Sequence, residues 1–328
     1  MKFRTTLITS LTLVLSLNSC EKARNLADKA SSAVKDTIAE NTGGTGGEVD
    51  PTLQKLVDQT PEGVVFRKDL PFPPRVEVRT TRRKSISGRL FNESAIEKRT
   101  DLINGTEVHV SKIERAANHV RYTLENTSYS IPAAKAGEEE KSATNPLEQI
   151  VPTKLPINFR RKGDSWTAEG VDTFRSAIIS KQIIPVFDRL LIENAAAPRP
   201  MWFSKHRFKQ GDKLVVTGDT LPMLLEGGKK GNFALVLDSF EPVDGHPCAS
   251  FTVTGDYSRK NFPDFEGRLM DEDVTISSGK IWLSLIYPII LREELETIQT
   301  FRSGGSGGLA SRGQGTVKVS VKRTWKPL

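Results

Sequence analysis

The sequence has few of the residue types from which metal sites and disulfide frameworks are built. It contains two cysteines and four histidines in 328 residues, which excludes a disulfide framework. The histidines are His109, His119, His206 and His246. None stands in an H-E-x-x-H pattern or near a cysteine at ligand spacing, whereas zinc needs three or four such ligands. We therefore expect no metal site, no cofactor and surface positions for the histidines.

Signatures of nucleophilic and nucleotide chemistry are also missing. The chain has no G-x-S-x-G elbow, and the Gly-rich stretch 303–308 lacks the Lys-Ser/Thr that completes a phosphate-binding loop. The acidic stretch 271–273 lacks the spacing of a calcium loop, which favours a solvated acidic turn. Cys248 opens an apolar strand pattern, which predicts a buried and inert thiol. Together these absences predict a protein that is not an enzyme.

The first twenty residues contain a short apolar run behind a positive head. Lys2 and Arg4 form a positive head, and an apolar run of eleven residues follows at 7–17. A transmembrane helix needs about 20 apolar residues, so this run is too short for one. The segment ends in Leu17-Asn18-Ser19-Cys20. A positive head, a short apolar run and a small residue before the cysteine are typical of an export signal.

This stretch resembles the type II signal peptide of bacterial lipoproteins, with its lipobox. The resemblance implies cleavage of residues 1–19, a diacylglycerol on the Cys20 sulfur and an acyl chain on its new amine. The membrane would then be a partner through these acyl chains, because several chains anchor a protein far more firmly than one. In some lipoproteins of this kind an Asp directly after the cysteine is an inner-membrane retention signal. Residue 21 is Glu, so the resemblance favours the outer membrane, facing the periplasm, within the bacterial cell envelope.

Residues 20–50 are predicted to separate the anchor from a folded body. Residues 21–40 are rich in Ala, Lys, Asp and Glu without Gly or Pro, a composition that favours a helix. The Gly-rich segment 41–50 predicts a flexible linker. The stripe of small residues along the helix is thin, so a solvated spacer is favoured over a coiled coil.

From residue 51 the sequence predicts a body made of antiparallel strands. Apolar residues alternate with polar ones around Val76, Val108, Val120 and Val319, as expected of strands with one solvated face. Asn104-Gly105, residues 116–118 and Asp244-Gly245 are turn signals, which predict tight connections between such strands. Strands are also expected at 233–240, 249–257, 274–276, 280–286 and 289–301.

One helical stretch interrupts the strands. Apolar residues recur at helical spacing in 174–191, and Pro185 divides them, which predicts two short helices packed on the sheet. The fold class expected is mainly β (a β-dominated α+β fold), with twisted antiparallel sheets, this helical pair and the N-terminal tether helix. The segment 132–152 lacks periodicity, so 51–328 forms either one domain or two subdomains split there.

A cluster of basic residues is the most distinctive charged feature, although the formal net charge of +7 is modest. Its members are Arg75, Arg79, Arg82, Arg83, Lys84 and Arg89. These side chains are candidates for contact with an anionic surface, such as lipid head groups or acidic glycans. The alternative is a charged strand edge that prevents aggregation. Nucleic acid is not expected, because an export signal precedes the cluster and no aromatic residues interleave with it.

The sequence leaves three functions open. The first is a non-catalytic binding or carrier module for an apolar or envelope ligand. The second is a structural or assembly protein that docks on another envelope component. An envelope enzyme whose site only the folded chain assembles is the third.

Overall fold

The computed structural model describes most of the body of the protein. The described residues are 48–67, 72–92, 97–131, 141–143, 151, 153–162, 165–169, 207–221, 229–263, 269–287, 289–303 and 311–328. The predicted signal peptide with Cys20, the tether helix, the helical pair and the Gly-rich loop after Ser303 lie outside these residues.

Within the described residues the fold is mainly β. One short helix, α2 (Pro51–Gln54), precedes the strands. The strands are β1 (Asp58–Thr60), β2 (Gly63–Val65), β3 (Arg75–Asn92), β4 (Glu97–Ala116), β5 (His119–Ile131), β6 (Lys141–Ala143), β7 (Pro156–Lys162), β8 (Ser165–Glu169), β9 (Lys213–Leu221), β10 (Lys229–Phe240), β11 (Cys248–Pro263), β12 (Leu269–Ser284), β13 (Ile290–Ser303) and β14 (Ser311–Pro327).

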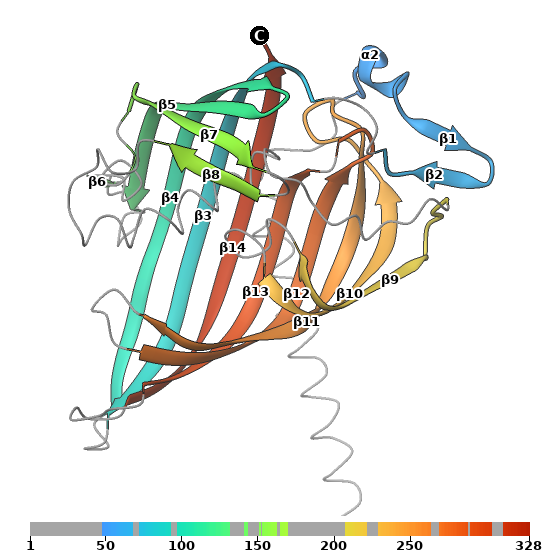
Figure 1. Ribbon diagram of the computed structural model, residues 1–328. Coiled ribbons are helices and arrows are strands. Elements are labelled where there is room, and N and C mark those ends of the chain that lie inside the picture. The colour runs from blue at the N-terminus through green and yellow to red at the C-terminus, as the bar shows by residue number, and fades with distance from the viewer. Residues whose placement is uncertain are drawn as a thin grey trace, which may run out of the picture. The chain divides into compact units, whose positions relative to one another are not determined.

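Twelve of the described strands form one antiparallel sheet (Figure 1). Its order is β8-β7-β5-β4-β3-β14-β13-β12-β11-β10-β9, and β6 pairs with β5 beside this path. Strands β1 and β2 form a separate pair. The first and the last long strands of the sheet, β3 and β14, are hydrogen-bonded neighbours, so both ends of the body contribute to its middle.

The predicted alternation is confirmed in β3, β5 and β14. Val76 and Val78 in β3 are at most 1% exposed. Val120 in β5 is 3% exposed, and Val317, Val319 and Val321 in β14 are 2–5% exposed. Successive side chains of a strand point to opposite faces, so these strands each bury one face and leave the other to solvent.

In β4 the alternation is inverted relative to the prediction. Val108 and Val110 are only half-buried, whereas His109 and Ser111 are buried. The strand register explains this, because Ile113 pairs with Val76 and the ladder to β3 continues without a shift to His109 opposite Thr80. The prediction of surface histidines is therefore wrong for His109 and also for His246, which is 7% exposed.

Two predicted turns are confirmed and one is wrong. Residues 117–118 connect β4 to β5. Asp244 and Gly245 have φ angles of 49° and 79°, as in the two-residue turns that suit β-hairpins. Asn104-Gly105, in contrast, lies inside β4. A Cβ at Gly105 would stand 2.1 Å from the Tyr129 hydroxyl, so the glycine makes room for a ring on the neighbouring strand.

The C-terminal strands are longer than their apolar patterns predict. The two strands expected at 274–276 and 280–286 are one strand, β12, with a register irregularity between Ile276 and Ser278. The expected acidic turn at 271–273 is wrong, because these residues lie within β12. Backbone hydrogen bonds continue the ladder through polar residues, and a pattern of apolar side chains does not predict this extension.

Candidate functional site

One face of the sheet is lined by apolar side chains across β9 to β14, and we call it the apolar face. Its members are Leu214, Val216, Phe233, Leu235, Leu237, Phe251, Val253, Val274, Ile276, Ile281, Leu295, Val317, Val319 and Val321. All except the partly buried Leu214 are at most 5% exposed. The register places them together, since Phe251 pairs with Leu237 on one side and with Ile281 on the other.

The apolar face gives way to charged residues in the middle of the sheet. A row of cross-strand partners runs through eight strands in the order Leu237, Phe251, Ile281, Glu293, Val321, Arg82, Glu107 and Tyr129. Beyond this row, Val76, Ile113, Val120, Leu124, Ile157 and Phe159 form a second apolar zone on β3, β4, β5 and β7. A polar band therefore separates two apolar zones on the same face.

The polar band consists of paired groups. Arg323 Nη1 lies 3.2 Å from Glu293 Oε2, and both side chains are 1% exposed. Arg82 Nη1 lies 3.4 Å from Glu107 Oε2. Bringing a charge out of water costs several kcal/mol unless it is paired, so these pairs account for how the sheet can bury four charged groups.

Further buried polar side chains complete the band. The Ser111 hydroxyl donates to the Tyr122 hydroxyl at 2.7 Å. Thr80 lies between Arg323 and His109 in the register of β14, β3 and β4. Its side chain and that of His109 are each 2% exposed.

A segment from outside the sheet covers part of the apolar face. Phe66 packs against Phe208 with ring centroids 5.5 Å apart and against Phe251 with centroids 5.6 Å apart. Val64 and Phe208 exchange two backbone hydrogen bonds, of 3.0 and 2.8 Å. Phe66 and Phe208, which are far apart in the sequence, thus cover the apolar face over β11.

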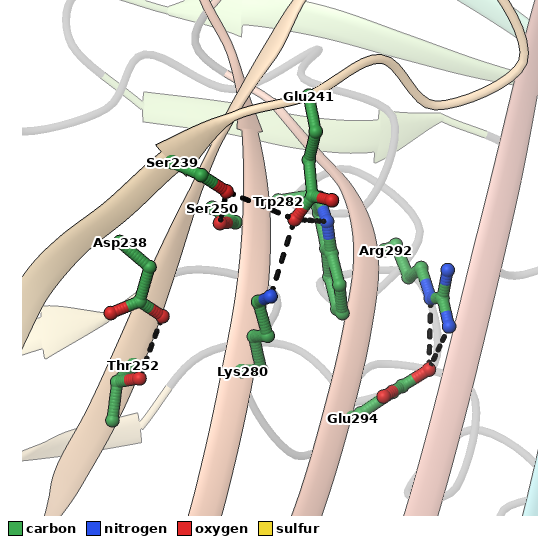
Figure 2. Close-up of polar contacts among 9 residues, drawn as sticks. All are labelled: Asp238, Ser239, Glu241, Ser250, Thr252, Lys280, Trp282, Arg292 and Glu294. Atoms are coloured by element: carbon green, nitrogen blue, oxygen red, sulfur yellow. Dashed lines mark hydrogen bonds and ion pairs between the residues drawn. The ribbon is translucent and has the colours of Figure 1, made fainter. Parts of the chain in front are cut away.

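The opposite face, which we call the outer face, carries a network centred on Trp282 (Figure 2). The indole Nε1–H donates to Glu241 Oε1 at 2.8 Å, and Lys280 Nζ lies 3.2 Å from the same oxygen. Burial acts to raise the pKa of Glu241, but the hydrogen bond and charge of Lys280, with the bond from Trp282, lower it overall. The guanidinium of Arg292 lies 4.4 Å from the Trp282 ring centroid. These contacts link β12 to β13 and to the residue after β10.

A buried histidine and serine lie side by side near the end of β12. His246 Nε2 and Ser284 Oγ are 2.7 Å apart, and Ser284 Oγ also accepts the backbone N–H groups of Ile286 and Tyr287 at 3.1 and 3.0 Å. Burial lowers the pKa of His246 to about 4, and the Asp50 carboxylate opposes this shift. Ser284 is 1% exposed. This geometry braces the turn after β12 and leaves the serine no approach for a substrate.

An arginine fills an aromatic cluster at the end of the sheet where β14 finishes. The Arg115 guanidinium lies 5.2 Å from the ring centroids of both Phe72 and Trp325. Tyr287 stacks on Phe72 at 5.5 Å. Burial lowers the pKa of Arg115 to about 10, with the charge of Tyr287 opposing. The cluster joins the segment before β3 to the last residues of the chain.

The structure divides the predicted basic cluster between the two faces. Arg75, Arg79 and Arg83 are exposed on the outer face. Arg82 is buried in the polar band, and Lys84 shares its side of β3 and is half-buried. For Arg89 the structure describes only the backbone, opposite Gln314 of β14. Cys20 lies outside the described residues, and Cys248 is confirmed as buried at 1% exposure.

Basic residues of β14 that were not predicted as part of this cluster lie beside it. Lys318, Lys322 and Lys326 alternate with buried residues of β14 and share the outer face with Arg79 and Arg83. The alternation of these lysines with Val317, Val319 and Val321 indicates that they share one face of β14. The pairing of β14 with β3 could not be predicted, because it joins segments more than 200 residues apart.

Two features are absent from the described residues. They contain no group of His, Cys, Asp and Glu side chains that could hold a metal ion. Among the same residues no helix has the length and apolarity to cross a bilayer.

Comparisons with known proteins identify no family. No protein-family model and no curated protein matches the chain. Among solved structures, lipovitellin, described for its lipid–protein interactions, is 10% identical, covers 78% of this chain and 26% of its own, and has a TM-score of 0.35. OpdK of Pseudomonas aeruginosa, in a structure with vanillate, is 8% identical over 76% and 99% of the two chains, with a TM-score of 0.17.

A third solved structure, the outer membrane protein OmpT of Vibrio cholerae, is 7% identical over 76% and 99% of the two chains, with a TM-score of 0.16. This chain spans about a quarter of the lipovitellin chain. The TM-scores are all low, so these likenesses support no statement about the function of this chain.

Proposed function

We propose that this protein is a lipid-anchored lipoprotein of the bacterial cell envelope whose sheet is a non-catalytic carrier of an apolar ligand. The anchor is the acylated Cys20, and Glu21 after it favours the outer membrane, with the body in the periplasm. The sequence segment 1–20 supports this address through its resemblance to a lipoprotein signal.

The observation that carries the proposal is the extent of the one-sided apolar face. Strands β11, β12 and β14 have 16, 16 and 17 residues, whereas strands of globular proteins most often have about five or six. A 16-residue strand is about 53 Å long. Apolar side chains from six neighbouring strands face the same way, which is a far larger surface than a hairpin needs for its own stability.

The contact between Phe66, Phe208 and Phe251 suggests how a ligand would enter. Phe66 and Phe208 come from two segments that are not part of the large sheet, so they can move away from Phe251 while the backbone ladder stays intact. An apolar ligand would then replace the rings on the sheet, and the burial of the face would be kept in both states.

Extraction of the purified protein tests the proposal. The full chain with Cys20→Ser carries no acyl chain of its own, so any lipid found by mass spectrometry is cargo or a contaminant. We expect a reproducible lipid class at near one molecule per protein or more after a detergent-free preparation. Recovery of no lipid, together with no binding of an added fluorescent fatty acid, would contradict the carrier function.

The address has its own test. Replacement of Cys20 by Ala should leave an unprocessed, unacylated precursor, whereas the natural chain should fractionate with the membrane. A Cys20→Ala protein that is processed and fractionates as before would refute the lipoprotein anchor and leave the carrier proposal untouched.

A further inference from the structure

Basic side chains of two adjacent strands share the outer face of the sheet, and we call them the basic strip. They are Arg75, Arg79 and Arg83 of β3 and Arg312, Lys318, Lys322 and Lys326 of β14. The register interleaves them, because Arg79 lies opposite Thr324 and Arg83 opposite Ser320. Strands are about 4.8 Å apart and alternate residues on one strand about 7 Å apart, so the cations form a dense, flat array.

Ion pairs with acidic residues compensate part of the positive charge of the strip. Glu77 is the one acidic residue among the described outer-face side chains of β3 and β14. Three acids from neighbouring segments pair with strip residues: Glu114 with Arg75 at 3.5 Å, Asp244 with Lys322 at 2.9 Å and Glu296 with Lys318 at 3.2 Å.

The described outer face of β11 and β12 does not share this character. On β11 and β12 the charged outer-face residues include Asp256, Asp271 and Asp273. Lys260 lies 3.6 Å from Asp271 and 3.9 Å from Asp273, so its charge is compensated there. An anionic partner would therefore contact β3 and β14 in preference to β11 and β12.

The residues between the cations indicate which anionic partner fits. Besides Glu77 and Gln314, they are small hydroxyl side chains, namely Thr81, Ser85, Ser87, Thr316, Ser320 and Thr324. Aromatic rings, which single-stranded nucleic acid needs for stacking, are not among the described side chains of the strip. A membrane surface needs no such geometry, because anionic head groups attract each basic residue near them by their collective potential.

We propose that the basic strip contacts the anionic phospholipid head groups of the membrane to which the protein is anchored. This inference rests on the proposed membrane address but not on the carrier function. It gives the body a defined orientation, in which the outer face of β3 and β14 lies against the bilayer and the apolar face points away from it.

Vesicle sedimentation tests the strip. The probe is vesicles of phosphatidylcholine alone or with 30% phosphatidylglycerol, in 0.1 M salt, and the protein is the full chain with Cys20→Ser. The test variant adds Arg79→Gln, Lys318→Gln and Lys326→Gln. Its matched control adds Lys55→Gln, Lys209→Gln and Lys213→Gln, which are exposed positions away from the strip and change the net charge equally. The apolar segment 7–17 is common to all variants, so differences among them report the strip.

We expect binding to the anionic vesicles to exceed binding to the neutral ones and to fall steeply at 0.5 M salt, where charges are screened within a few ångströms. Each basic residue near an anionic surface contributes about five-fold in membrane affinity. The test variant should therefore lose vesicle affinity on the order of 100-fold, and the control should change little. Equal losses in both variants would show a net-charge effect and overturn the proposal. Equal binding to both vesicle types would also overturn it. The same holds if the protein binds an acidic polymer but binds no vesicles. Lipid content on extraction is measured separately, so failure here leaves the carrier proposal standing.

Discussion

Arg323 and Glu293 form an ion pair in which each side chain is 1% exposed, with Arg323 Nη1 3.2 Å from Glu293 Oε2. Arg323 Nη1 also donates to the Ile290 carbonyl at 3.4 Å. The pair stands on the face of the sheet that carries Val319, Val321 and Leu295. Two charges in such surroundings depend on each other, because each compensates the desolvation of its partner.

Removal of one member of this pair should be more harmful than removal of both. We expect Glu293→Leu or Arg323→Met alone to lower the free energy of unfolding by about 3–5 kcal/mol, since a buried charge loses its partner. The double replacement Glu293→Leu with Arg323→Met should cost much less than the sum. Urea unfolding of the four proteins measures this, and additive losses would contradict the coupling.

Stability should depend on pH through His246. Its pKa is about 4 in the folded protein and about 6.5 in an unfolded chain. The unfolded state therefore binds more protons between these values, and the free energy of unfolding should fall as the pH is lowered from about 6.5 to about 4. Above pH 6.5 the contribution is complete, and it amounts to about 3 kcal/mol.

Urea unfolding at pH 7 and pH 4.5 measures this contribution. His246→Phe should flatten the difference between the two values, although the loss of the bond to Ser284 lowers stability at both. His119→Phe, at a half-buried position, is the matched control. The account of His246 would be wrong if its replacement left the pH dependence of wild type intact.

Two glycines with positive φ should respond differently to replacement by alanine. Gly255 has φ +150°, and a Cβ there would stand 2.2 Å from the backbone oxygen of Asn232. Gly218 has φ +66° and open space around it. We expect Gly218→Ala to cost about 1 kcal/mol from backbone strain and Gly255→Ala about 3 kcal/mol or more, since neighbouring backbone must move. Thermal unfolding compares them, and equal losses would show that the close approach of β10 is unimportant.

The tryptophan on the outer face should contribute through its donor group as well as its ring. Trp282→Phe removes the hydrogen bond to Glu241 Oε1 and weakens the contacts of the ring with Arg292 and Lys280. We expect a loss of about 1–3 kcal/mol, because Glu241 loses a donor in a partly buried setting. Glu241→Gln in the Phe variant should then cost less than in wild type, as chemical unfolding of all four proteins can show.

The buried face of several strands could be predicted from the sequence because the local alternation of apolar and polar residues agrees with the pairing of the strand in the sheet. In β14, Val317, Val319 and Val321 alternate with Lys318 and Ser320, and the structure buries the valines. In β4 the local pattern pointed the wrong way, because Val108 and Val110 are more apolar than His109 and Ser111. Pairing of Ile113 with Val76 and Tyr122 decided the register over these local preferences.

The polar band and the basic strip could not be predicted for a different reason. Glu293 and Arg323 are 30 residues apart, and Arg82 and Glu107 lie on another pair of strands. Their arrangement depends on which strands become neighbours, and β14 pairs with β3 across almost the whole body. A run of basic residues in one strand also says little by itself, since alternation sends Arg82 and Arg83 to opposite faces.

Binding of a fluorescent fatty acid to two matched variants tests the central claim most directly. Ile86 lies on β3 opposite Val317 and packs partly buried against the apolar face, whereas Ile298 on β13 is 41% exposed on the outer face. The carrier account predicts that Ile86→Gln weakens binding at least several-fold and that Ile298→Gln leaves it unchanged in equally folded proteins. Equal affinities for both variants and wild type, or no saturable binding at all, would contradict it.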